Sequence, residues 1–210
     1  MPGLIRRCHR ELPNVRLQLH DCTTMELIDR VRDGRVDIAL AAGPLPDTTG
    51  LSVSFMTHER IVVALPTDHR LAGESSIDLA DLAGEGFALY SETGHSGLRT
   101  IVASACQAAG FTPREVASAD TVAGLMGHVS AGVCVSFAPD RMRLFSPPGV
   151  VFTPVAPRPA GVDRPDPADI LRVQVLSIVR DAHHEPLIAN VLRLLQDPTI
   201  LDAIREADAN

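Results

Sequence analysis

The residues of this 210-residue chain best suited to chemistry gather at three predicted helix starts. These are Thr23-Thr24, His95-Ser96 and Asp120-Thr121. A helix start offers unpaired backbone N–H groups and the positive end of the helix dipole, and both favour a bound anion. Each pair could equally be an ordinary N-cap, which contributes about 1 kcal/mol to helix stability. Three such starts, each at the carboxyl end of a strand, favour a receptor for a carboxylate or similar anion.

Catalytic and metal-binding motifs are absent from the sequence. It contains no HExxH, GxSxG, Walker or GxGxxG pattern, and His95 is the only histidine near the predicted ligand site. The cysteines are too far apart for a CxxC pair, and three fit small core positions, whereas Cys22 beside the predicted site could be reactive. We therefore expect no enzyme activity, no catalytic residue, no metal and no cofactor.

The element that must position the first pair is the segment 21–40, DCTTMELIDRVRDGRVDIAL. Its pattern predicts the end of a strand, a helix capped at Thr23-Thr24, a turn at Gly34 and a second strand over 36–40. A strand–helix–strand unit of this length builds a parallel sheet and directs the helix N-terminus at its carboxyl edge. Ligands of open α/β folds bind at that edge.

Strands and helices alternate along most of the chain, which is typical of an α/β fold. Two lobes are expected, lobe I over 1–88 with 176–210 and lobe II over 89–175, with crossings at 89–91 and 173–177. Further strands are predicted at 15–19, 51–55, 59–66, 87–91, 114–118, 133–137, 150–155 and 172–180, with an exposed loop at 156–169.

Composition excludes several classes of protein. A net charge of −7 argues against a nucleic-acid-binding face on this chain, and 3% aromatic residues argue against a base-stacking platform. There is no apolar run of about 18 residues, so we expect no membrane span. The opening MPGLIRRCHRELP lacks the apolar core of a signal peptide, which favours a cytoplasmic location.

Several stretches resemble the effector-binding domain of LysR-type transcriptional regulators. In order, they are IRRCHRELPNVRLQLHDCTTMELIDRVRDGRVDIALAAGP, HERIVVALPTDHRLAG, IDLADLAGEGFALYS, CQAAGFTP and VAGLMGHVSAGVCVSFAPD. The resemblance covers nearly the whole chain. It implies a two-lobed fold like that of type II periplasmic binding proteins, each lobe a mixed sheet flanked by helices, with a small effector between the lobes.

The resemblance also implies the ligand-binding residues and the partners. The ligand role falls on Thr23, Thr24, Gly43, Pro44, Thr93, Gly94, His95, Ser96, Gly97, Thr121 and Val122. Such domains pair with a second copy as homodimers or tetramers, and effector binding alters how the dimers arrange bound DNA.

Two features of the family are missing from this sequence. The N-terminal winged helix-turn-helix is absent, so DNA contact is assigned to none of these residues. The family's first strand would precede Met1, so we expect the strands at 15–19 and 36–40 to lack a shared neighbour. Two alternatives are a stand-alone solute-binding receptor of the transport type, which usually carries a signal peptide, and an enzyme on the same fold.

Overall fold

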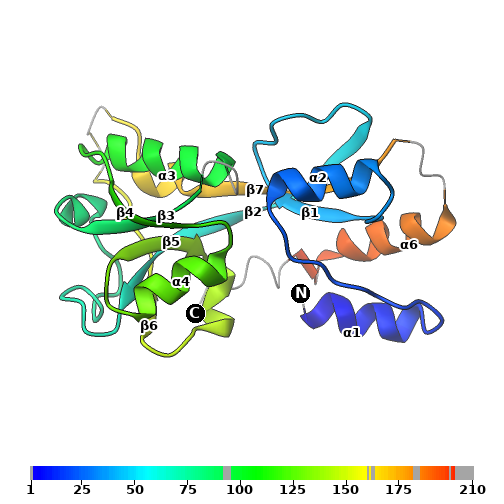
Figure 1. The fold of residues 1–210 in the computed structure, drawn as a ribbon, viewed down its shortest axis with the longest axis horizontal. Helices are drawn as coiled ribbons and strands as arrows, with labels where there is room; N and C mark the ends of the chain where they lie inside the picture. Colours follow the sequence, from blue (N-terminus) through cyan, green and yellow to red (C-terminus); the bar gives the residue numbers. More distant parts are fainter. Residues whose placement is uncertain are drawn as a thin grey trace. The chain divides into compact units, whose positions relative to one another are not determined.

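The computed structural model describes residues 2–91, 96–159, 161, 164–181, 185–198 and 200–201. The chain divides into two compact units, unit 1 over Met1–His58 and Gln174–Asn210, and unit 2 over Glu59–Val173. The sequence prediction differs, because it assigned 59–88 to the first lobe and placed the first crossing at 89–91. The physical reason is that the predicted strands 51–55 and 59–66 form one 16-residue strand, β2 (Leu51–Pro66), whose second half pairs inside unit 2 (Figure 1).

In the part of unit 1 that the structure describes, three helices accompany a small antiparallel strand pairing. Strand β1 lies opposite the later part of β7, with Ala39 facing Ile178 and Ala42 facing Val175. The first half of β2 belongs to this unit as well. The other elements are α1 (Pro2–Glu11), α2 (Thr24–Arg32), β1 (Ala39–Ala42), β7 (Arg172–Arg180) and α6 (Pro186–Leu195).

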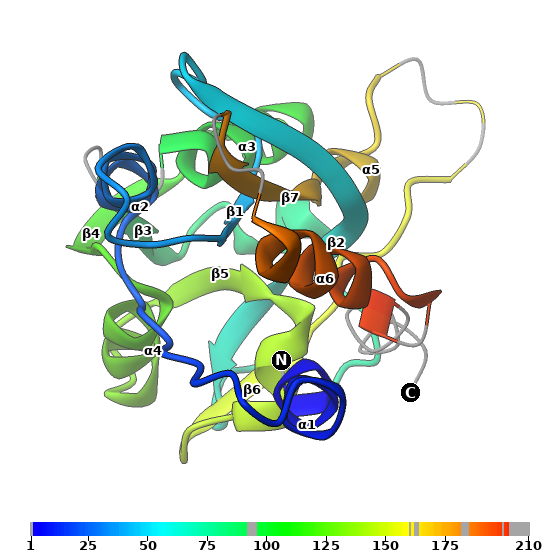
Figure 2. The ribbon, with the colours of Figure 1, turned by 90° about the vertical axis from the view of Figure 1, so that its right-hand side faces the viewer.

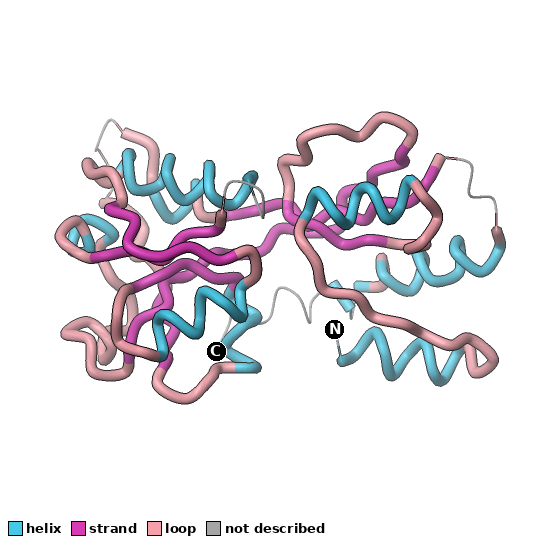
Figure 3. The backbone as a smooth tube through the Cα atoms, viewed as in Figure 1, coloured by secondary structure: helices cyan, strands magenta, loops and turns pink. Residues whose placement is uncertain are grey.

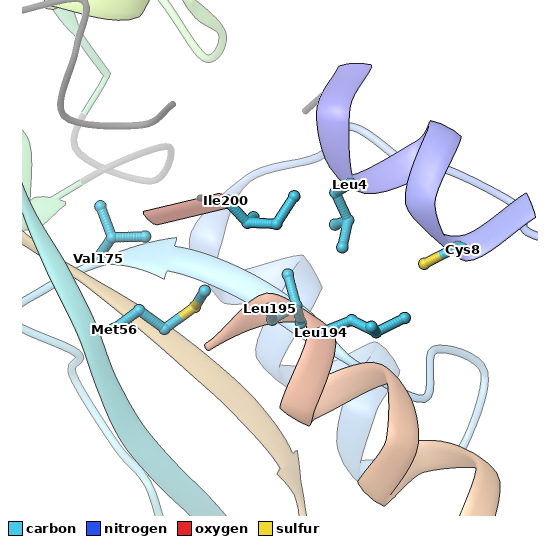
Figure 4. Close-up of a cluster of buried hydrophobic side chains, with 7 residues drawn as sticks. All are labelled: Leu4, Cys8, Met56, Val175, Leu194, Leu195 and Ile200. Atoms are coloured by element: carbon cyan, nitrogen blue, oxygen red, sulfur yellow. The ribbon is translucent and has the colours of Figure 1, made fainter. Parts of the chain in front are cut away.

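The core of unit 1 has two apolar clusters. In the first, α1 packs against α6, as Figure 2 shows. Met56 of β2 and Val175 of β7 add apolar side chains to the same cluster. In the second, Ile28 and Val31 of α2 are fully buried against Ala39 and Ile178. The first cluster, drawn in Figure 4, consists of Leu4, Cys8, Met56, Val175, Leu194, Leu195 and Ile200.

The strand predicted at 15–19 does not form, and the prediction is wrong. Figure 3 draws this segment as loop. Leu17 still packs against the first cluster, but Leu19 is 64% exposed. Alternating apolar residues satisfy one requirement of a strand, whereas its backbone also needs a neighbour, and no described strand lies beside 15–19.

Unit 2 is built on a mixed sheet. Strand β3 runs parallel to β4 and β5, while the second half of β2 runs antiparallel to β5 and β6. The 3₁₀ helix η2 and the short helix α5 form where the sequence predicted no helix. The elements are η1 (Leu79–Leu82), β3 (Gly86–Tyr90), α3 (Ser96–Ala108), β4 (Arg114–Ala119), α4 (Val122–Ser130), β5 (Val135–Pro139), η2 (Asp140–Phe145), β6 (Val150–Thr153) and α5 (Pro167–Ile170).

The core of unit 2 combines aromatic stacking with two buried carboxylates. Phe87 of β3 stacks on Phe137 of β5 with ring centroids 5.9 Å apart. Glu59 is 3% exposed and pairs with Arg141, and Asp140 is 2% exposed and pairs with Arg143. A buried charge is tolerated only when it is paired, so each arginine offsets a desolvation cost.

Candidate functional site

The helix start predicted in unit 1 is present and capped as expected. Thr23 has extended backbone angles, and its hydroxyl oxygen accepts a hydrogen bond from the Glu26 N–H at 3.3 Å. Thr24 is the first helical residue and is buried, at 9% exposed. The capping role predicted for Thr23 is therefore confirmed, while the ligand role of both threonines stays a prediction.

The turn that follows α2 brings the end of β1 back to this helix start. Gly34 has φ +70 and its N–H donates to the Val31 carbonyl at 3.1 Å, which confirms the left-handed residue predicted at this helix end. Helix α2 then lies along β1 in the opposite direction, so its N-terminus and the carboxyl end of β1 share one end of the unit (Figure 1). Gly43 and Pro44 directly follow β1 at that end, and a cis peptide bond joins them to each other.

The charged side chains of Glu26 and Arg30 lie on the first two turns of α2. Glu26 forms an ion pair with Arg30 at 2.6 Å, and Arg30 also lies 3.4 Å from the ring of His20. Burial, followed by the neighbouring Glu26, raises the pKa of the Cys22 thiol above its ordinary value. A raised pKa lowers the thiolate fraction, so this structure does not support a reactive Cys22.

In unit 2 the carboxyl ends of the parallel strands β3 and β4 meet. The Ser91 N–H donates to the Ala119 carbonyl at 3.1 Å, and the Ser91 hydroxyl donates to the carboxylate of Asp120. Thr121 caps α4, since its hydroxyl oxygen accepts from the Gly124 N–H at 3.3 Å. A carboxylate therefore stands beside this helix start, where it offsets the positive end of the helix dipole.

Arg99 of α3 ties together three elements of unit 2. From α3 it donates to the Tyr90 carbonyl at 2.8 Å, at the end of β3, and to Glu115 of β4 at 2.6 Å. The two bonds hold α3 in place against the parallel strands. Guanidinium groups suit such a role because their donors are planar and fixed in direction.

The predicted residues are brought together within each unit. Thr23, Thr24, Gly43 and Pro44 share one end of unit 1. Thr121 and Val122 lie beside Ser91 and Asp120 in unit 2. Ser96 begins α3 and Gly97 follows it, whereas Thr93, Gly94 and His95 lie outside the described residues.

Sequence reasoning missed Ser91, Arg99, His20 and Arg30. The partners of Ser91 and Arg99 lie 29 and 9 or more residues away, so no local pattern could reveal them. Among the residues that the structure describes, no group of three His, Cys, Asp or Glu side chains could hold a metal ion. No described helix is long and apolar enough to cross a membrane.

Two sheet-containing units linked by two strands, with capped helix starts at strand ends, define the two-lobed fold of periplasmic-binding-protein-like ligand receptors. The family described as the LysR substrate binding domain matches residues 1–197. The chain belongs to this family, which confirms the resemblance identified in the sequence.

Individual relatives agree with this assignment. "HTH-type transcriptional regulator ShiR" of Corynebacterium glutamicum (strain R) is 35% identical over 156 residues, which cover 74% of this chain and 52% of that protein. The chain spans about half the length of the curated relatives it matches. These relatives are transcriptional regulators rather than enzymes.

Solved structures share the fold at low sequence identity. The "BenM effector binding domain with its effector benzoate" has a TM-score of 0.72 at 20% identity, and the match covers 93% of this chain and 84% of that solved chain. The "effector binding domain of QuiR in complex with shikimate" has a TM-score of 0.74 at 17% identity and covers 93% and 88%. At this identity the likeness shows the fold alone.

Proposed function

We propose that this chain is the effector-sensing part of a LysR-type transcriptional regulator and binds a small organic anion. The observation that carries the proposal is the family match over residues 1–197 together with the capped helix starts at strand ends in both units. The proposed ligand residues are Thr23, Thr24, Gly43, Pro44, Thr93, Gly94, His95, Ser96, Gly97, Thr121 and Val122.

The anionic end of the ligand is assigned to the start of α2. This start combines backbone N–H groups, two threonine hydroxyls, and Arg30 on the second turn. Benzoate and shikimate, named with BenM and QuiR, are both carboxylates, which supports a carboxylate as the class of ligand.

The start of α4 differs from the start of α2, because the carboxylate of Asp120 stands directly before its capping residue. A carboxylate approaching it would meet the negative charge of Asp120, and like charges this close disfavour binding. Asp120 accepts hydrogen bonds, so a ligand hydroxyl or ammonium group fits beside it. The proposal therefore favours a hydroxylated or amino acid-like carboxylate over a plain one.

The test replaces Thr23 and Thr24 by Val. Losing the hydroxyls should weaken binding of shikimate, measured by isothermal titration calorimetry, by roughly tenfold or more, because hydrogen bonds to charged groups contribute about 1.5–3 kcal/mol each. Loss of the Thr23 cap alone should lower the free energy of unfolding by about 1 kcal/mol.

The matched control is Thr112→Val, an exposed threonine away from both helix starts. The Thr112→Val variant should bind shikimate with the same affinity as the unchanged chain. If the double variant loses stability but binds shikimate, benzoate and amino acid-like carboxylates as before, the threonines are structural caps and the ligand proposal is wrong.

DNA binding and assembly belong to the longer regulator in this proposal. The net charge of −7 makes phosphate binding by this chain unfavourable, so the DNA contacts are assigned to a winged helix-turn-helix outside these residues. Pairing of this domain as a homodimer or tetramer would convert effector binding into a changed arrangement on DNA. Size-exclusion chromatography with light scattering, with and without shikimate, tests the pairing.

A further inference from the structure

A cavity of about 170 Å³ is lined by residues of unit 2, and none of these lining residues belongs to the proposed effector site. Its walls come from four segments: β2, the loop after β6, helix α5 and the first residue of β7. The residues that matter for its chemistry are Arg60, Ile61, Val155, Pro157, Asp169 and Arg172.

The walls of the cavity are held by backbone bonds. The Ile61 N–H donates to the Leu171 carbonyl at 2.7 Å, which fixes β2 beside the end of α5. The Ala156 N–H donates to the Ile77 carbonyl at 2.8 Å, and Ile77 pairs with Val155 in a parallel bridge. The walls at Ile61 and at Val155 are therefore held by backbone hydrogen bonds before any ligand arrives, and a preformed site binds at lower entropic cost.

The third wall is cross-linked by side chains. The Arg158 N–H donates to one carboxylate oxygen of Asp166 at 2.8 Å, and the other oxygen accepts from the Ala168 N–H at 2.9 Å. The Arg158 guanidinium also donates to the Ala108 carbonyl of α3 at 2.8 Å. These hydrogen bonds connect the loop that follows β6 to helix α5 and to helix α3.

The lining pairs charge with an apolar base. Ile61 and Val155 are 2% and 7% exposed and present a buried apolar surface, while Arg172 is exposed and Arg60 is half-buried. The polar part of the lining consists of the guanidinium groups of Arg60 and Arg172 and the carboxylate of Asp169. Guanidinium groups bind carboxylates through paired, directional hydrogen bonds.

We propose that this cavity is a second ligand site, which takes a small organic carboxylate with a compact apolar body. The carboxylate contacts Arg60 and Arg172, and the body rests on Ile61, Val155 and Pro157. The volume is below the roughly 300–1,000 Å³ of pockets for drug-sized ligands, so only a small acid fits. The apolar base disfavours inorganic phosphate, which could not cover it.

The experiment titrates benzoate into the Thr23→Val/Thr24→Val chain and follows the methyl NMR signals of Ile61 and Val155. This background weakens the proposed effector site, so the methyl signals report the cavity independently of it. Saturable shifts of both methyl signals are expected with benzoate, and much smaller ones with the neutral benzyl alcohol. Arg172→Gln should weaken benzoate binding by at least about tenfold, since one charge-assisted interaction is lost.

Arg16→Gln is the matched control, because Arg16 is exposed on unit 1, and it should leave the benzoate affinity within about twofold. Arg172 is exposed, so its replacement should leave the fold intact, and Arg60→Gln provides a second loss of affinity. The proposal is overturned if benzoate leaves both methyl signals unmoved, or if both arginine variants bind benzoate like the parent. Failure of shikimate to bind at the α2 start would leave these outcomes unchanged.

Discussion

At the scale of single residues, the close approach of α4 to β4 depends on one missing side chain. A Cβ built on Gly124 would lie 2.7 Å from the Cβ of Ala119, closer than real Cβ atoms come. Three residues on, a Cβ on Gly127 would meet nothing within 4 Å. A side chain is therefore excluded at Gly124, whereas there is room for one at Gly127.

We expect Gly124→Ala to destabilise the chain by about 1–3 kcal/mol, because the added methyl group forces α4 away from β4. Gly127→Ala should be neutral or stabilising by up to about 1 kcal/mol, because alanine favours the helix. Urea unfolding measures both. Equal effects from the two substitutions would show that the helix has room to move.

The buried thiol of Cys106 is expected to make stability fall at alkaline pH. The 19 basic residues are all arginine and the chain has a single tyrosine, so few other side chains titrate there. Burial raises the pKa of Cys106 to about 12. An unfolded thiol ionises near pH 9 while the folded one does not, so its contribution is complete below about pH 9 and is lost between about pH 9 and 12.

We expect the free energy of unfolding to fall between about pH 8 and about pH 10.5, and to fall less in Cys106→Ala. The comparison concerns the pH dependence, since the substitution itself also creates a small cavity. Urea unfolding of both proteins at the two pH values gives the four free energies of unfolding to be compared. An identical decline in both proteins would assign the effect to other groups.

At the scale of elements, the segment 15–19 shows what a strand lacks when it has no neighbour. Its alternating residues resemble those of a strand, yet the structure pairs it with none of the described strands. Strand β7, by contrast, is hydrogen-bonded to β1 on one side and β2 on the other.

Hydrogen exchange should separate these two segments. The amides of 16–19 should exchange orders of magnitude faster than those of 175–178, because exchange protection follows stable backbone pairing. NMR or mass spectrometry can follow both in one sample. Comparable protection would mean that 15–19 has a partner strand in solution, for instance from a second copy.

At the scale of the whole molecule, both units depend on the same two strands, because β2 and β7 each pass from one unit to the other. Leu195 is 3% exposed in the first cluster of unit 1, whereas the only tyrosine, Tyr90, lies in unit 2. Tyrosine fluorescence therefore reports unit 2 alone.

We expect Leu195→Ala to destabilise the chain by about 2–5 kcal/mol and to shift the Tyr90 unfolding midpoint by as much as the midpoint from circular dichroism. Leu187→Ala on the same helix should change little, since Leu187 is 41% exposed. An unmoved Tyr90 midpoint with a biphasic circular dichroism curve would show that the units unfold separately.

Sequence alone predicts the features that depend on neighbours along the chain. The Thr23 and Thr121 caps and the left-handed Gly34 all follow from local patterns, and the structure has them. Features that need distant partners were missed or misplaced: the absence of pairing at 15–19, the assignment of 59–88, and the Ser91–Asp120 contact across 29 residues. Propensity describes one segment, whereas pairing is a property of two.

The crossings between the units have a mechanical consequence. At His58–Glu59 and Val173–Gln174 the chain passes through regular strands rather than loops. Just beyond them, the Glu59–Arg141 pair and the bond from Ile61 to Leu171 clamp both strands to unit 2. Any rotation of one unit against the other would therefore have to be absorbed by the backbone torsions of a few residues in β2 and β7.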